Sequence, residues 1–236
     1  LLVALAFVAA PASAQIVFAD FEAVDGDGNP TNAVAFGDSG FGGGPGFGGG
    51  TGLQIGTDGA GGQGFAGGGT TGNDGSGSLV DISGAEYITF YFDPGDLASD
   101  QVVLQVNLQE DVNGDGTFDP TAGTGEDEFQ AEYRLSPSSD GYQFVAIPIA
   151  AFTDDNVAVA GPGADDGFDF TKLLGVVFAF GDYQAAGTTF TVRFDDITFS
   201  NASMSDTAVE LPEVFETAPV AFPNPTAGLA TVSFDL

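Results

Sequence analysis

The sequence predicts an all-β domain, either a sandwich or a barrel. Apolar and polar side chains alternate in several short runs, and clusters of glycine, proline, asparagine and aspartate separate them. Because successive side chains of a strand point to opposite faces, such runs are typical of half-buried strands. No stretch has the pattern of a capped amphipathic helix. Many short strands between turn residues indicate a sandwich or barrel. The expected strands are residues 16–22, 87–92, 102–109, 129–135, 142–149, 173–180 and 190–199.

The stretch 86–128 carries the clearest strand patterns. In 87–92, Ile88, Phe90 and Phe92 share a predicted core face, and the tyrosines face the other way. In 102–109 the aliphatic side chains alternate with carboxamides. We expect the tyrosines and carboxamides to form one outer face, with an arginine from the next strand. The predicted ligand-binding residues are Tyr87, Tyr91, Gln105, Asn107, Gln109 and Arg134.

This combination of side chains suits a polyol. Aromatic rings pack on the C–H groups of sugars, and amides and arginine bind hydroxyl groups. The alternative is an ordinary sheet surface, because tyrosine and threonine favour strands in any case.

Composition restricts the possible partners. The 236 residues suffice for one domain with tails, and 23 phenylalanines supply a core. The chain has 34 acidic residues and only three basic ones, Arg134, Lys172 and Arg193, so the net charge is −31. This field repels nucleic acids and anionic membranes and favours cations. An acidic surface poor in lysine is also typical of halophilic proteins, in which salt screens the self-repulsion.

Missing residue types restrict the chemistry. Without cysteine or histidine, the chain has no disulfides, no histidine general base and none of the usual zinc ligands. A metal would be hard and bound by oxygen, which indicates Ca²⁺. A glycosidase needs a carboxylic acid of raised pKa in a shaped cleft, which one small sandwich with dispersed carboxylates does not predict. We therefore expect no enzymatic activity.

The loop after residue 110 resembles the first part of an EF-hand calcium loop. Its oxygen-bearing side chains alternate, and Gly116 permits a sharp turn. The twelfth position, which should hold a bidentate glutamate, is Ala122, so Glu126, Asp127 or Glu128 would have to substitute by folding back. The alternative is a solvated hairpin tip. The predicted metal ligands here are Asp111, Asn113, Asp115, Thr117 and Asp119.

Both ends of the chain read as export segments. Residues 1–14 are apolar and end in Ala-Ser-Ala, as a signal peptide cleaved after Ala14 would, although its charged n-region is missing. The run is too short to span a bilayer. The alternative is a short buried element. Residues 201–217 read as a linker, and 218–236 as the start of a truncated second β-domain.

Two resemblances add to this reading. The C-terminal PNPTAGLATVSFDL, residues 223–236, resembles the opening of the sorting domain of the type IX secretion system. That resemblance implies passage through the outer membrane by the type IX machinery, followed by release or surface anchoring. Residues 15–200 are similar to galactose-binding-like jelly rolls, in particular carbohydrate-binding module family 11. The carriers are DFE at 20–22, LQI at 53–55, and the stretches 81–92, 141–152, 168–180 and 191–200.

The second resemblance implies a jelly-roll β-sandwich that binds extracellular polysaccharide or glycan. It also implies a structural calcium ion where the first and last strands meet, near Glu22 and Asp196. The family usually stacks sugars on aromatic rings of a concave sheet, and the absence of tryptophan departs from that pattern. The alternatives are a structural or adhesive sandwich with no small ligand, and an accessory region of a polysaccharide hydrolase.

Overall fold

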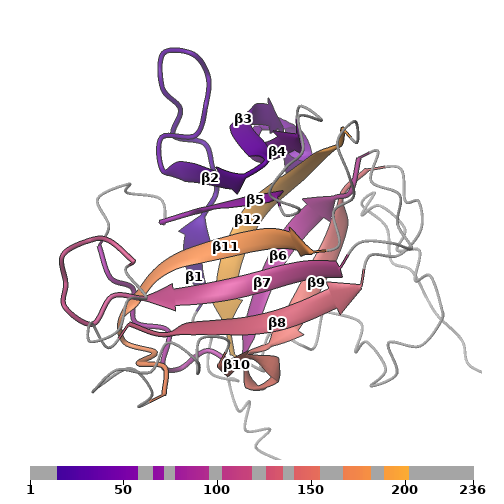
Figure 1. Ribbon diagram of the computed structural model, residues 1–236. Coiled ribbons are helices and arrows are strands. Elements are labelled where there is room, and N and C mark those ends of the chain that lie inside the picture. Colours follow the sequence, from indigo (N-terminus) through magenta and orange to yellow (C-terminus); the bar gives the residue numbers. More distant parts are fainter. Residues whose placement is uncertain are drawn as a thin grey trace, which may run out of the picture.

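The computed structural model describes residues 15–57, 66–71, 78–95, 103–118, 126–134, 141–154, 167–181 and 189–201. Two six-stranded antiparallel sheets pack face to face (Figure 1). Within these ranges the helical elements are two 3₁₀ turns, η1 (Phe47–Gly49) and η2 (Ile149–Ala151). The predicted all-β jelly-roll sandwich is confirmed. In the part of the chain described, no helix is long and apolar enough to cross a membrane.

The first sheet, here sheet I, contains the chain's first and last described strands. Its order is β3 (Ser39–Pro45), β4 (Thr51–Thr57), β12 (Thr191–Ser200), β6 (Tyr87–Asp93) and β9 (Gln143–Pro148), and β1 (Gln15–Ala19) also pairs with β12. Pro148 ends the edge strand β9, as expected of a residue that donates no ladder hydrogen bond.

The second sheet, sheet II, lies in front of sheet I in Figure 1. Its order is β10 (Thr153–Asp154), β8 (Glu128–Arg134), β7 (Val103–Glu110), β11 (Leu173–Gly181), β5 (Ala66–Thr70) and β2 (Ala33–Gly37). The strongly apolar strand β11 lies inside sheet II, between β7 and β5.

The core between the sheets is built largely from phenylalanine. Phe178 of sheet II stacks on Phe194 of sheet I, with ring centroids 3.8 Å apart and planes 13° from parallel. Phe90 meets Phe178 edge to face at 5.1 Å. The predicted inward sets of β6 and β7 are buried, which confirms the alternation of both strands. The buried side chains in question are Ile88, Phe90, Phe92, Leu104, Val106 and Leu108.

The glycine-rich part of the chain forms strands. Residues 39–57 make the β3–η1–β4 hairpin, and β5 has three consecutive buried glycines. A Cβ atom on Gly67 would lie 2.2 Å from the Phe36 ring, so this strand depends on glycine for the close approach of β2.

Candidate functional site

The prediction that the tyrosines and carboxamides form one outer face is wrong. Tyr87 and Tyr91 lie on β6 in sheet I, whereas Gln105, Asn107 and Gln109 lie on β7 in sheet II. Both alternations are right, but β6 pairs with β9 and β12, and β7 pairs with β8 and β11. The outer faces of the two strands are therefore on opposite sides of the sandwich.

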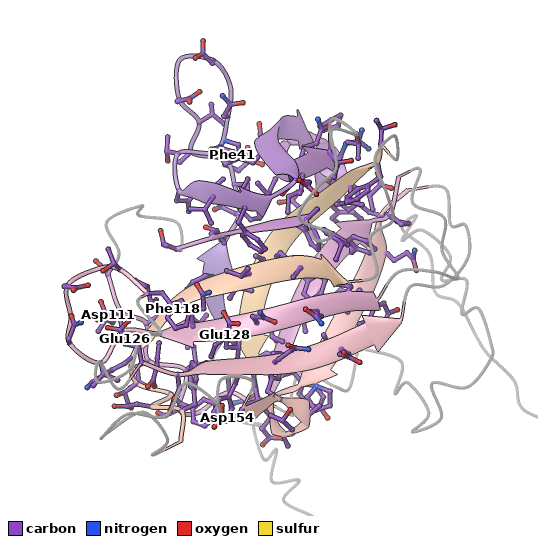
Figure 2. All side chains as sticks on the ribbon, in the orientation of Figure 1. Phe41, Asp111, Phe118, Glu126, Glu128 and Asp154 are labelled. Carbon is purple, nitrogen blue, oxygen red and sulfur yellow. The ribbon has the colours of Figure 1, made fainter. Side chains whose placement is uncertain are left out.

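The carboxamides of β7 share their face with acidic and amide side chains of β8. Antiparallel register pairs Gln105 with Glu132, Asn107 with Gln130, and Gln109 with Glu128, and paired residues point to the same side. Figure 2 views this side of the molecule and labels Glu128 on it. Arg134 pairs with Val103 further along β8, where only its backbone position is described. The amide face consists of Gln105, Asn107, Gln109, Glu128, Gln130 and Glu132.

Glu128 fixes two of these amides. One of its carboxylate oxygens accepts from Asn107 Nδ2 at 2.8 Å, and the other accepts from Gln109 Nε2 at 2.6 Å. Asn107 is buried, and its Oδ1 has no hydrogen-bond partner among the residues described. A buried acceptor without a donor costs free energy. This oxygen has almost no accessible surface, so the groups of the face that a ligand can reach are those of Gln105, Gln109 and the β8 side chains.

The amide face continues across β11 and β5 as short side chains. Val177 and Ala179 of β11 stand opposite Asn107 and Gln105. Beyond them the register reaches glycines of β5. The face therefore combines a row of hydrogen-bonding groups with a low, uncharged strip beside it.

The loop after residue 110, here called the acidic loop, has carboxylates from both sides of the β7–β8 connection close together. Carboxylate oxygens of Asp111, Asp115 and Glu126 all lie within 4.8 Å of one another. Asp111 and Glu126 are buried and Asp115 is exposed. Figure 2 shows Asp111 and Glu126 side by side at one end of the sandwich. Of the three acids that could substitute for the missing ligand, Glu126 is the one whose carboxylate lies close to Asp111 and Asp115.

Hydrogen bonds organise the acidic loop around these carboxylates. Asp111 accepts from the amides of Gly114 and Gly116 at 2.5 and 2.7 Å. Asn113 Nδ2 donates to Glu126 at 2.7 Å. Hydrogen bonds from Thr117 hold the pKa of Asp115 below its ordinary value.

The remaining ligand predicted for the acidic loop, Asp119, lies outside the residues described. Glu110 and Asp127, next to the loop, are buried as well. Glu110 accepts from the backbone amides of Asp127 and Asp169 at 3.3 and 2.6 Å. Four acidic residues are thus buried at the base of one hairpin.

The other predicted metal pair, Glu22 and Asp196, lies in a looser group of carboxylates. Burial raises the pKa of Asp196, and Asp20 and Glu22 add to the rise. Burial, together with repulsion from Asp196 and Glu22, raises the pKa of Asp195 to about 7. No three carboxylates of this group converge within 4.8 Å, as judged from the described chain. The residues are brought near each other, but not into a compact cage.

The two tyrosines have separate surroundings. Tyr91 is stacked against Phe47, with centroids 3.6 Å apart and planes 10° from parallel, and Phe144 contacts it edge-on at 5.5 Å. Tyr87 instead lines a mainly apolar pocket of about 510 Å³, together with Phe129, Ile149 and Phe170. Phe47 and Phe144 were missed by sequence reasoning. For Phe47 the available signal was a large ring isolated among glycines.

Comparison with known proteins identifies the fold. No protein-family model and no curated protein matches the chain. A family 11 carbohydrate-binding module from Clostridium thermocellum, in complex with a β-1,3-1,4-mixed-linked tetrasaccharide, superposes with a TM-score of 0.55 at 16% identity, covering 82% of this chain and 98% of that one. A second family 11 module, from a cellulosomal cellulase of the same organism, gives 0.53 at 15% identity, covering 80% and 95%. A family 30 carbohydrate-binding module gives 0.55 at 16% identity, covering 80% and 99%. The sandwich therefore has the fold of these carbohydrate-binding modules.

Proposed function

We propose that this protein is an extracellular, non-catalytic carbohydrate-binding module whose amide face binds neutral polysaccharide. The shared fold supports a carbohydrate-binding type of module. The observation that carries the proposal is the row of amide and carboxylate groups on the outer face of β7 and β8. Such a row can both donate to and accept from adjacent hydroxyl groups of a polymer.

The charge of the amide face favours a neutral ligand. Glu128 and Glu132 place carboxylates on it, and the whole chain carries −31. Sulfated or uronic polysaccharides would be repelled, whereas the partly exposed amides of Gln105 and Gln109 can bind neutral hydroxyl groups without a charge penalty.

Affinity electrophoresis in gels containing neutral β-glucans tests this proposal. We expect the wild-type protein to be retarded and the Gln105→Ala and Gln109→Ala variants to lose about tenfold in affinity, the cost of one or two hydrogen bonds. Gln15→Ala, an exposed glutamine on sheet I, is the matched control. Equal retardation of all variants would assign binding elsewhere, and no retardation on any neutral polymer would favour a structural or adhesive sandwich.

We also propose that the acidic loop binds a structural Ca²⁺ ion through Asp111, Asp115 and Glu126. Asn113 Oδ1 and the Thr117 carbonyl would complete an oxygen set of the kind that calcium prefers. The support is the convergence of three carboxylates, two of them buried, because buried like charges need a cation or protons to balance them. Bound calcium would supply that balance and hold the β7–β8 connection closed.

Export is the third part of the proposal and rests on sequence alone. The signal peptide at 1–14 and the type IX sorting segment at 223–236 both lie outside the residues described. We infer cleavage after Ala14 and delivery to the cell surface or medium. N-terminal sequencing of the secreted protein tests the cleavage site. A reporter fused to a chain ending at residue 200 should stay in the periplasm if the tail is the export signal.

A further inference from the structure

Four aromatic rings gather on the outer face of sheet I, on the side away from the amide face. Phe47 stacks on Tyr91, Phe144 meets Tyr91 edge-on, and Tyr142 meets Phe47 at 6.0 Å. Phe47 and Phe144 are 36% and 40% exposed, although phenylalanines of both sheets fill the core. We call Phe47, Tyr91, Tyr142 and Phe144 the aromatic patch.

Two hydrogen bonds to carboxylates hold the turn that carries Phe47. The Phe47 amide donates to Asp195 Oδ2 at 2.7 Å, and the Thr51 amide donates to Glu22 Oε1 at 3.2 Å. A Cβ atom on Gly50 would lie 1.7 Å from the same Glu22 oxygen, so a larger residue there would push the Glu22 side chain away from the turn. The exposed ring is therefore held in place, which lowers the entropy cost of binding on it.

Negative charge surrounds the aromatic patch. Asp195, Tyr91 and Phe144 stand side by side on three adjacent strands, on one face. Glu22 and Asp196 reach the surface beside them. Burial and nearby carboxylates raise the pKa of Tyr91, Tyr142, Asp195 and Asp196, and a bound cation would reverse part of each rise.

The cation for these carboxylates is not supplied by the nearest basic residue. Arg193 on the same face already contacts Asp93 at 2.8 Å and Gln54 at 3.2 Å. No three of these particular carboxylates converge within 4.8 Å among the described residues, so they do not form the kind of cage found in the acidic loop. An ammonium group needs no such cage, because it can pair with a single carboxylate while the sugar that carries it packs on the aromatic rings.

We propose that the aromatic patch binds saccharides that carry protonated amino groups, as in oligomers of glucosamine. The exposed faces of Phe47 and Phe144 pack on the apolar face of the sugar ring, and the ammonium group faces Glu22 and Asp196. A free ammonium ion binds well only where aromatic rings lie on several sides of it, whereas a flat pyranose can pack on one exposed aromatic ring. The site lies across the sandwich from the amide face and does not depend on it.

Titration calorimetry with three hexamers tests the inference: glucosamine, N-acetylglucosamine and β-1,4-linked glucose. At about pH 6, where the amine remains protonated, we expect the glucosamine hexamer to bind about tenfold more tightly than the acetylated one. Its affinity should fall by a similar factor in Phe144→Ala, whose ring is solvent-exposed on the edge strand β9. Glu22→Gln should weaken it also, and about 0.1 M salt should weaken it further. Gln105→Ala should have no effect.

Several outcomes overturn the inference. Equal affinity for the acetylated and amino hexamers would mean that the ammonium group is not recognised. Loss of glucosamine binding in Gln105→Ala, with Phe144→Ala unchanged, would place the amine on the amide face. Salt-sensitive binding of equal strength in all variants would show general attraction to an acidic protein. Failure of neutral glucans to bind, with Phe144-dependent glucosamine binding intact, would reject the function proposed for the amide face and leave this site standing.

Discussion

Replacing Glu126 with glutamine should change stability in opposite directions with and without calcium. Without the ion, the Glu126 and Asp111 carboxylates are buried within 4.8 Å of each other and repel. Glutamine removes that repulsion and keeps the oxygen that accepts from Asn113. With calcium bound, the same change removes a charged ligand. We therefore expect E126Q to be more stable than wild type in chelator and less stable in calcium.

The size of the effect follows from the geometry. Two unit charges 4.8 Å apart repel by about 3 kcal/mol at the effective dielectric typical of protein sites. Relaxation and water penetration reduce this, so we expect a gain of about 1–2 kcal/mol for E126Q in chelator. A calcium concentration about 100 times the dissociation constant adds about 2.7 kcal/mol to the wild-type protein. This exceeds the gain of E126Q in chelator, so the two stability orders should cross if E126Q loses the ion.

Urea unfolding in chelator and in about 10 mM calcium, up to about 100 times the dissociation constants of extracellular sites, measures both orders. Glu132→Gln provides the matched control, because Glu132 is exposed on β8 away from the loop. It should shift stability little, and equally in both buffers. If E126Q is destabilised by the same amount in both buffers, Glu126 is a structural hydrogen-bond acceptor and the calcium proposal fails.

Three further changes test the fold and its charges. Asp195→Asn should flatten the pH dependence of stability. The folded pKa of about 7 exceeds the ordinary 3.8, so the contribution of this carboxyl to the free energy of unfolding rises as the pH falls from about 7 to 4. The rise is at most about 4 kcal/mol before solvent screening reduces it. Urea unfolding measured across this pH range checks the prediction. The same slope of unfolding free energy against pH in both proteins would refute it. Gly69→Ala should cost about 2 kcal/mol or more, because its Cβ would lie 2.3 Å from the Val176 carbonyl oxygen, while Gly40→Ala, with no atom within 4 Å, should be near neutral. Equal midpoints would contradict the close approach of β5 and β11. Phe178→Ala should cost about 3–5 kcal/mol, against under about 0.5 for the exposed Phe41→Ala, and similar losses would mean that the ring stack is not the core.

The sequence was sufficient for the faces of individual strands but not for their partners. Period-two alternation identifies Ile88, Phe90 and Phe92 as core because burial acts on each strand locally. Which sheet a strand joins depends on long-range pairing. Here residues 87–93 and 103–110 follow each other in the chain yet pair in different sheets. Consecutive strands are neighbours only about two-thirds of the time, so the shared tyrosine–amide face was an inference that alternation alone cannot support.

The acidic loop shows what a register argument adds. The pairing of Gln109 with Glu128 continues in step to place Asp111 opposite Glu126. Assuming that strands 103–110 and 128–134 form a hairpin would therefore have selected Glu126 from the three acids that were left open. The pairing of the glycine-rich strand β5 with β2 could not be predicted in this way. It depends on the Phe36 ring lying against Gly67, which is a contact between distant segments.

The sandwich separates its two candidate faces by a rigid core. Phe90, Phe178 and Phe194 fill the space between sheets that lie about 10 Å apart. Changes that far apart with no shared partner usually add in free energy. Combining Gln105→Ala with Phe144→Ala should thus remove neutral-glucan and glucosamine binding independently, each by the amount of its single variant. Coupling between the two losses would instead require one polymer to pass around an edge of the sandwich and contact both faces at once.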